Sequence, residues 1–213
     1  MNPTNTVKRT YPRIGPGSAG VSMTVEEFDR IPAHRWDDRY RYELIRGVLV
    51  VSPFAGPGED SPNDELGYLL RRYRDDHPQG FLLDETLFEQ YLHTANRRRC
   101  DRAIWVGLGR TPDVERDVPA IVVEFVGPRK RDFLRDYEEK RDEYLTAGVR
   151  EYWVIDRFRR TMTVYRPGAG GQAAAQTVTE PQEYQTPLLP GFVLPLARLL
   201  ARADAVTPKT RKR

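Results

Sequence analysis

The most constraining feature of this sequence is a short apolar run, residues 120–126, that contains one acid in its middle. The run, AIVVEFV, is rich in β-branched residues and is typical of a strand buried on both faces of a sheet. Its acid is Glu124. An ionised carboxylate in such a strand is costly unless a cation, a metal ion or several hydrogen bonds meet it. We therefore expect another part of the fold, or a bound ion, to meet this charge.

A helix is predicted directly after this strand, from about Arg131 to Ala147, with Gly148 as a left-handed C-cap. Its helical period predicts an inward stripe that contains Phe133, Tyr137, Lys140 and Tyr144. Asp136 precedes Lys140 by one turn on the same face. A strand acid followed by an inward helix lysine is a plausible pair of catalytic groups. It is also the pattern of a simple buried salt bridge, and the spacing leaves both open.

Composition excludes several classes of protein. The chain has 213 residues, 31% of them charged and 39% hydrophobic, which indicates a globular protein rather than a disordered or membrane-spanning one. No apolar run approaches the roughly 20 residues that a spanning helix needs. The N-terminus lacks the apolar core of a secretory signal. The single cysteine, Cys100, excludes an intrachain disulfide, so we expect a cytoplasmic protein.

The domain organisation is predicted to be simple. Residues 1–21 are rich in Gly, Pro, Ser and Thr and are expected to be a flexible segment. Residues 22–203 are expected to form a single domain, and residues 204–213 a basic disordered tail. Gly15, Gly17 and Gly20 make a formal GxGxxG, but no strand precedes it and no helix follows in the required place. We interpret this motif as a loop.

Patterns of hydrophobicity and capping predict the remaining elements. Thr24 and Glu27 form a capping box that begins a short helix, and Asn63 is the predicted N-cap of a longer one that runs to about Asp76. A hairpin is expected over residues 42–52, with its turn at Arg46 and Gly47. Further strands are predicted at residues 81–92, 97–106, 151–156, 161–165 and 177–179, and a closing apolar helix within residues 191–203.

Two more acids lie on predicted strands. Asp101 is at the mouth of the strand of residues 97–106, on the same side as Ala103 and Trp105 by a period of two. It suits either a metal site or an ion pair with a neighbouring arginine. Glu43 begins the predicted hairpin, and it is either a solvent-facing strand acid or a third acid of the same site. Carboxylates from adjacent strands beside a lysine suit magnesium-assisted phosphodiester cleavage.

The order of these segments resembles a known family. In chain order, these segments are YELIRGVLVVSP, an acid that follows the arginines at the start of a strand, PAIVVEFVGP, a helix with the pattern D…K…Y, GVREYWVID and PLLPGF. This order is similar to the Uma-type restriction endonucleases of the PD-(D/E)xK nuclease superfamily, over nearly the whole chain. The resemblance implies an α/β fold with a restriction-endonuclease-like core, a mixed central β-sheet flanked by α-helices, and a divalent metal, Mg²⁺ or Mn²⁺.

The resemblance also implies roles for individual residues. Asp101 and Glu124 match the two acids of the superfamily motif, and the backbone carbonyl of Phe125 would be an additional metal ligand. Glu43 matches the acid of the family's opening segment. Val126 stands where the superfamily usually has lysine, and Lys140 matches the helix lysine of the Uma-type pattern.

Three positions depart from the family pattern. Cys100 stands in place of proline, Asn63 in place of a histidine and Arg46 in place of an acid. Because Asn63 has no titratable group, any role that the family's histidine has is in doubt for this chain.

Three hypotheses follow from these residues. The first is a metal-dependent endonuclease that hydrolyses DNA phosphodiester bonds, acting as a homodimer. Its expected phosphate contacts are Arg97, Arg98, Arg99, Arg129, Lys130 and Arg131. The second is a catalytically inactive nuclease-like domain that binds nucleic acid or a protein partner. The third is a structural protein whose acids only form an ion-pair network.

Overall fold

The computed structural model of the protein describes residues 13–129, 133 and 135–207. Its chain divides into two compact units. The first contains the residues up to Phe54 together with Ala95–Arg97, and the second contains Ala55–Thr94 and the residues from Arg98 onward. No helix within these described ranges is long and apolar enough to cross a membrane.

The first unit is built on a short helix and a hairpin. Helix α1 (Val25–Asp29) begins at the predicted capping box, in which Thr24 Oγ1 accepts from the Glu27 amide at 3.1 Å. Strands β1 (Tyr40–Ile45) and β2 (Val48–Pro53) pair antiparallel, as expected. Their turn places Arg46 and Gly47 at positive φ, a geometry in which glycine is favoured. The short 3₁₀ turns η1 (Pro16–Ser18) and η2 (Ala33–Arg35) complete the unit.

The second unit contains a mixed sheet. Its strands in chain order are β3 (Leu83–His93), β4 (Arg97–Val106), β5 (Ile121–Phe125), β6 (Glu151–Asp156), β7 (Thr161–Pro167) and β8 (Ala173–Thr179). They lie in the order β4-β5-β6-β7-β8, and β3 pairs with β4. Among the described residues of these strands, β5 and β6 pair parallel, whereas β4–β5, β6–β7 and β7–β8 pair antiparallel. A separate ribbon joins β9 (Glu183–Gln185) to β10 (Val193–Pro195). This architecture agrees with the expected mixed α/β fold.

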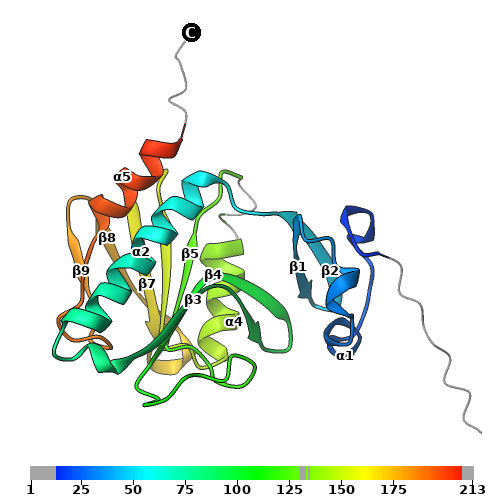
Figure 1. The fold of residues 1–213 in the computed structure, drawn as a ribbon, viewed down its shortest axis with the longest axis horizontal. Coiled ribbons are helices and arrows are strands. Elements are labelled where there is room, and N and C mark those ends of the chain that lie inside the picture. The colour runs from blue at the N-terminus through cyan, green and yellow to red at the C-terminus, as the bar shows by residue number, and fades with distance from the viewer. Residues whose placement is uncertain (1–12, 130–132, 134, 208–213) are drawn as a thin grey trace, which may run out of the picture. The chain divides into compact units, whose positions relative to one another are not determined.

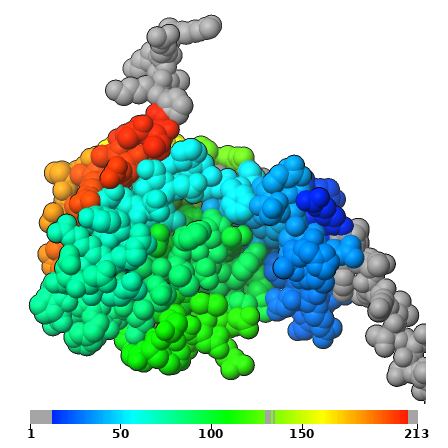
Figure 2. All heavy atoms as spheres, viewed as in Figure 1, coloured from blue at the N-terminus to red at the C-terminus, as the bar shows by residue number. Residues whose placement is uncertain are grey.

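Helices cover both faces of this sheet. Helix α2 (Pro57–Asp76) and helix α5 (Leu196–Val206) pack together on one face, and α4 (Lys140–Thr146) lies on the other (Figure 1). Figure 2 shows side chains of α2 and α5 closing over their face of the sheet. Residues of β5 alternate between the two cores, because successive strand residues point to opposite faces. Val123 and Phe125 belong to the α2–α5 core, and Val122 and Val126 to the α4 core.

The structure corrects two predicted helices. Helix α2 begins at Pro57 and continues through Pro62, so Asn63 is an internal residue and not the N-cap. Pro57 at the first helical position supplies the start, since its fixed φ suits that position. The predicted helix of residues 131–147 contains a π-helical turn, η4 (Arg135–Glu139), before α4. The positive φ of Gly148 agrees with its predicted capping role.

Element boundaries differ at the C-terminal end. Helix α5 runs to Val206, so it includes three residues of the tail that was expected to be disordered. Strand β8 is longer than expected and begins at Ala173. Short alanine-rich segments carry little periodic signal, which explains both differences.

A buried polar cluster joins three strands around Glu151, which pairs in register with Ile121 at the other end of β5 from Glu124. Glu151 at the start of β6 is 1% exposed and accepts from Trp153 Nε1 at 2.8 Å and from the Tyr184 hydroxyl at 2.9 Å. Arg166 Nε of β7 donates to the same carboxylate at 2.8 Å. Hydrogen-bonded partners of this kind compensate the cost of burying a charge. The cluster therefore explains why an acid opens the EYWVID segment.

This cluster gives a prediction about stability. Replacing Glu151 with alanine leaves buried donors of Trp153 and Tyr184 without their acceptor, and should lower the free energy of unfolding by about 2–4 kcal/mol. Urea unfolding measures the change. Glu115→Ala, at an exposed loop position, is the matched control and should stay within about 0.5 kcal/mol of the unmodified chain. Equal stability of the two variants would contradict the structural role of Glu151.

Candidate active site

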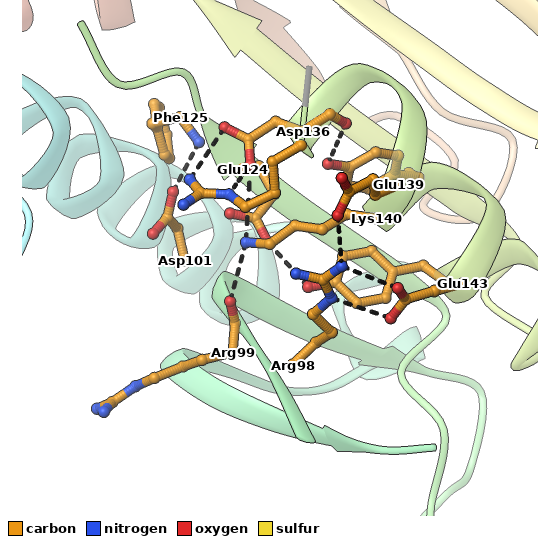
Figure 3. Close-up of polar contacts among 12 residues, drawn as sticks. Arg98, Arg99, Asp101, Glu124, Phe125, Asp136, Glu139, Lys140 and Glu143 are labelled. Carbon is orange, nitrogen blue, oxygen red and sulfur yellow. Dashed lines mark hydrogen bonds and ion pairs between the residues drawn. The ribbon is translucent and has the colours of Figure 1, made fainter. Parts of the chain in front are cut away.

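Strands β4 and β5 bring two acids together. Their register pairs Arg102 with Val123, and the next step of that register places Asp101 opposite Glu124. Both side chains belong to the sheet face that carries α4, as the period of two predicted. Asp101 Oδ2 accepts from the main-chain amide of Phe125 at 2.7 Å, which fixes the carboxylate beside the end of β5 (Figure 3).

The charge of Glu124 is met by Lys140. The Lys140 ammonium lies 2.8 Å from Glu124 Oε1, and the two side chains are 4% and 2% exposed. The Tyr144 hydroxyl donates to the same oxygen at 3.0 Å. Lys140 Nζ also donates to the main-chain carbonyl of Arg99 at 3.1 Å and lies 3.8 Å from Asp136 Oδ1. Figure 3 shows this ammonium directed at the strand acids.

The π-helical turn η4 sets the position of the lysine. It ends at Glu139, directly before Lys140, and one such turn rotates the residues after it relative to an α-helix. Asp136, fully buried within the turn, accepts from Arg135 Nε at 2.9 Å. The Tyr152 hydroxyl of β6 donates to the main-chain carbonyl of Asp136 at 2.7 Å. The Tyr152 hydroxyl thus holds the turn to the sheet one helical turn before the lysine.

Burial governs the protonation of this cluster. Removal from water raises the pKa of Glu124, and the nearby Asp101 and Asp136 raise it further, while Lys140 opposes them. Burial also raises the pKa of Asp136, against the lowering effect of Lys140 and Arg135. When ionised, the three acids outnumber the two nearby cations, Lys140 and Arg135, by one charge at the C-terminal end of β5. Such a site favours a further cation.

Asn63 and Arg102 support Asp101 from the opposite face of β4. Asn63 Nδ2 donates to the main-chain carbonyl of Asp101 at 2.9 Å. The buried guanidinium of Arg102 donates to Asn63 Oδ1 at 2.7 Å and to Thr86 Oγ1 at 3.0 Å. Burial lowers the pKa of Arg102 to about 10. The amide of Asn63 therefore links helix α2 to the strand residue that carries the acid.

The sequence did not indicate several of these residues as part of the site. Asn63 was predicted to be a helix cap, and the contacts of Tyr144, Tyr152 and Arg102 were not anticipated. An available signal was the position of Tyr144, four residues after Lys140 on the same helical face. The contact of Asn63 with Asp101 depends on the packing of α2 on β4, which no local pattern encodes.

The arginines at the start of β4 have partners within the protein. Arg97 donates to Asp29 at 2.8 Å, and Arg99 Nε lies 2.7 Å from Glu89. Arg98 is 1% exposed and pairs with both Glu139 and Glu143 at 2.9 Å (Figure 3). Its burial argues against the predicted phosphate contact by Arg98 and gives it another function, which is to tie β4 to η4 and α4.

Arg129 and Glu43 are two further residues of the predicted site. Arg129 is exposed after β5, whereas Lys130 and Arg131 lie outside the described residues. Glu43 is buried in β1 of the first unit, where it pairs in register with Val50. Its contribution to the site stays a prediction, as does a ligand role for the Phe125 carbonyl.

The donor set fits magnesium or manganese. Both ions prefer oxygen ligands, and magnesium retains several waters, so it takes only a few ligands from the protein. Asp101, Glu124 and the Phe125 carbonyl would supply such a set. Within residues 13–129, 133 and 135–207, no group of three or more His, Cys, Asp or Glu side chains is placed to hold a metal ion. Two carboxylates and one carbonyl would be the protein's whole contribution, and water would fill the other positions around the ion.

The fold and the paired acids define a nuclease-like α/β domain, and comparison with known proteins supports this class. A solved structure titled as a putative nuclease belonging to DUF820, from Anabaena variabilis ATCC 29413, matches with a TM-score of 0.66. The match covers 85% of this chain and 99% of that chain at 16% sequence identity, which establishes the shared fold.

The family model Uma2, described as "Putative restriction endonuclease", matches residues 25–197. The chain therefore belongs to the Uma2 family. A search of curated proteins gave no match.

The raised pKa of Glu124 predicts a pH-dependent stability in EDTA. Burial raises the pKa of Glu124 from its ordinary value of 4.5 to about 8, so ionising this carboxyl costs free energy in the folded state. Its contribution to the free energy of unfolding therefore falls as the pH rises from about 4.5 to about 8. Glu124→Gln removes this effect. As the pH rises from about 5 to about 8, the free energy of unfolding of the variant should increase by about 1–3 kcal/mol relative to that of the unmodified chain, measured by urea unfolding.

Glu115→Gln provides the control for this measurement, because a substitution at this exposed loop position should change the free energy of unfolding by no more than about 0.5 kcal/mol. A constant difference between Glu124→Gln and the unmodified chain over the same range would show that Glu124 titrates like an ordinary surface acid.

Proposed function

We propose that this protein is a divalent-metal-dependent endonuclease that hydrolyses DNA phosphodiester bonds, with magnesium or manganese as its cofactor. The observation that carries the proposal is the 2.8 Å contact of Lys140 Nζ with Glu124 Oε1 beside Asp101. Val126, directly after β5, stands where the superfamily usually has lysine, and α4 supplies an ammonium to the strand acid instead. The family's description as putative restriction endonucleases agrees with this chemistry.

Each residue has a distinct role in the proposed reaction. Asp101 and Glu124, with the Phe125 carbonyl, would hold the metal ion. Bound there, the metal would orient a phosphate oxygen and lower the pKa of a bound water. Lys140 would place a positive charge beside the attacking water or the developing negative charge of the phosphate. Tyr144 keeps the carboxylate of Glu124 oriented through its 3.0 Å hydrogen bond.

The setting of the reaction is part of the same proposal. Cleavage of both DNA strands is favoured by a two-fold homodimer that presents one site to each strand. Arg129, exposed just after β5, remains a proposed phosphate contact. The single cysteine, Cys100, is buried and reduced, which fits the cytoplasm as the working compartment.

Cleavage of plasmid DNA tests the proposal. The unmodified chain with magnesium or manganese should nick or linearise a supercoiled plasmid, and EDTA should stop the reaction. Glu124→Gln preserves the side-chain shape and should abolish cleavage, because a neutral amide is a poor magnesium ligand. Lys140→Met should lower the rate by about 100- to 1,000-fold, the usual loss when a charge-stabilising donor is removed.

Glu115→Ala is the control and should cut at the unmodified rate. Urea unfolding of each variant separates loss of activity from loss of fold. Cleavage that persists in a folded Glu124→Gln protein would refute this site.

The second candidate function is nucleic-acid or protein binding without cleavage. It is favoured by the absence, within the described ranges, of any metal-holding group of three or more His, Cys, Asp or Glu side chains. Titration calorimetry with magnesium distinguishes the two functions. Heat of binding that disappears in Asp101→Asn supports the nuclease, whereas no binding at millimolar magnesium supports the binding domain.

A further inference from the structure

The turn between β6 and β7, residues 157–160, lies beside the candidate active site. Strands β5 and β6 are parallel, and their register pairs Phe125 with Ile155. The chain therefore leaves β6 at the same end of the strands at which Glu124 lies on β5. The Tyr137 hydroxyl, from the π-helical turn before Lys140, lies 3.4 Å from Asp156 Oδ2. The turn is thus anchored to the element that positions the lysine.

Hydrogen bonds and ion pairs hold this turn in one conformation. Asp156 is buried, and its Oδ1 accepts from the amides of Phe158 at 2.9 Å and Arg159 at 3.0 Å. Arg160, at positive φ, forms ion pairs with Glu180 and with Asp204. Because Asp156 and Arg160 are both held, the backbone between them is fixed, and it presents one side chain to solvent.

That side chain is Phe158, which is 52% exposed. The Arg157 guanidinium carbon lies 4.5 Å from the centroid of its ring. Arg157 has no carboxylate partner among the ion pairs of the described residues. Its Nη1 donates to Thr207 Oγ1 at 2.6 Å, and its buried Nε has no hydrogen-bond partner there. Arg159 lies 3.9 Å from the ring centroid of Phe133, while its nearest carboxylate oxygen, on Asp156, is also 3.9 Å away. The turn thus displays an aromatic ring between two weakly neutralised cations.

Aromatic rings among arginines are the usual means of holding unpaired nucleotides. Bases stack on the rings, and guanidinium groups contact the neighbouring phosphates. A single exposed aromatic residue is common on protein surfaces and alone indicates nothing. Here the ring of Phe158 is held by a fixed turn and flanked by arginines. It lies at the end of the strands that carries the paired acids.

We propose that residues 157–160 bind nucleic acid with an unpaired base next to the phosphate that is cut. Phe158 stacks on that base, and Arg157 and Arg159 contact the adjoining phosphates. The substrate class is therefore single-stranded DNA or DNA with an unpaired segment. This inference rests on the proposed nuclease function and adds the form of DNA that the same site accepts.

Fluorescence polarisation tests the proposal with calcium in place of magnesium, so that binding is measured without cleavage. The probe is a fluorescein-labelled oligonucleotide, used as a single strand and annealed to its complement. Phe158→Ala should weaken binding of the single strand by about tenfold, with little change for the duplex. Phe158→Trp, which keeps an aromatic face, should bind the single strand at least as tightly as the unmodified chain.

Phe81→Ala is the matched control. Phe81 is 75% exposed and lies in the 3₁₀ turn η3 (Gly80–Leu82), where the Leu82 carbonyl accepts from the Gly107 amide beyond the end of β4. Since β4 runs antiparallel to β5, this position is at the opposite end of β5 from Glu124. Its loss should leave both affinities unchanged.

The outcomes separate this inference from the function on which it rests. Equal affinities of Phe158→Ala and the unmodified chain, or equal losses on both forms of DNA, overturn the stacking role and leave the nuclease proposal intact. A chain that binds neither form overturns both. Selective loss for the single strand, with recovery in Phe158→Trp, supports the inference.

Discussion

The second unit depends on how it accommodates one carboxylate, that of Glu124, in the middle of an apolar sheet. An isolated charge there would cost several kcal/mol. The fold places the Lys140 ammonium 2.8 Å away and the Tyr144 hydroxyl 3.0 Å away. A purely structural sheet could avoid this cost with an apolar residue, because replacing a buried ion pair with well-packed hydrophobic groups is often neutral or stabilising. The retained charge is therefore an argument for chemistry at this point.

Much of the architecture could be predicted because its signals are local. The apolar run of β5, the capping box at Thr24 and the hairpin turn at Arg46 and Gly47 each depend on neighbouring residues. The inward direction of Lys140 also followed from the helical period. The π-helical turn η4 and the early start of α2 at Pro57 could not be predicted, because both depend on contacts with other elements.

The site was predictable only in part for the same reason. Asp101 and Glu124 share a face of adjacent strands, which strand periodicity and the family resemblance indicated. The supporting contacts came from packing between elements. Asn63 reaches the Asp101 main chain from α2, and Arg98 is occupied by Glu139 and Glu143 although its sequence context suggested an exposed basic cluster. A run of three arginines cannot show which of them is buried.

A crystal of the protein soaked in manganese gives the most direct test of the central claim, that these carboxylates are placed to hold a divalent ion. Manganese has an anomalous signal that locates it independently of the protein model. We expect anomalous density between the carboxylates of Asp101 and Glu124, within ligand distance of both. Occupied manganese sites elsewhere, with none at this pair and Lys140 still bound to Glu124, would contradict it.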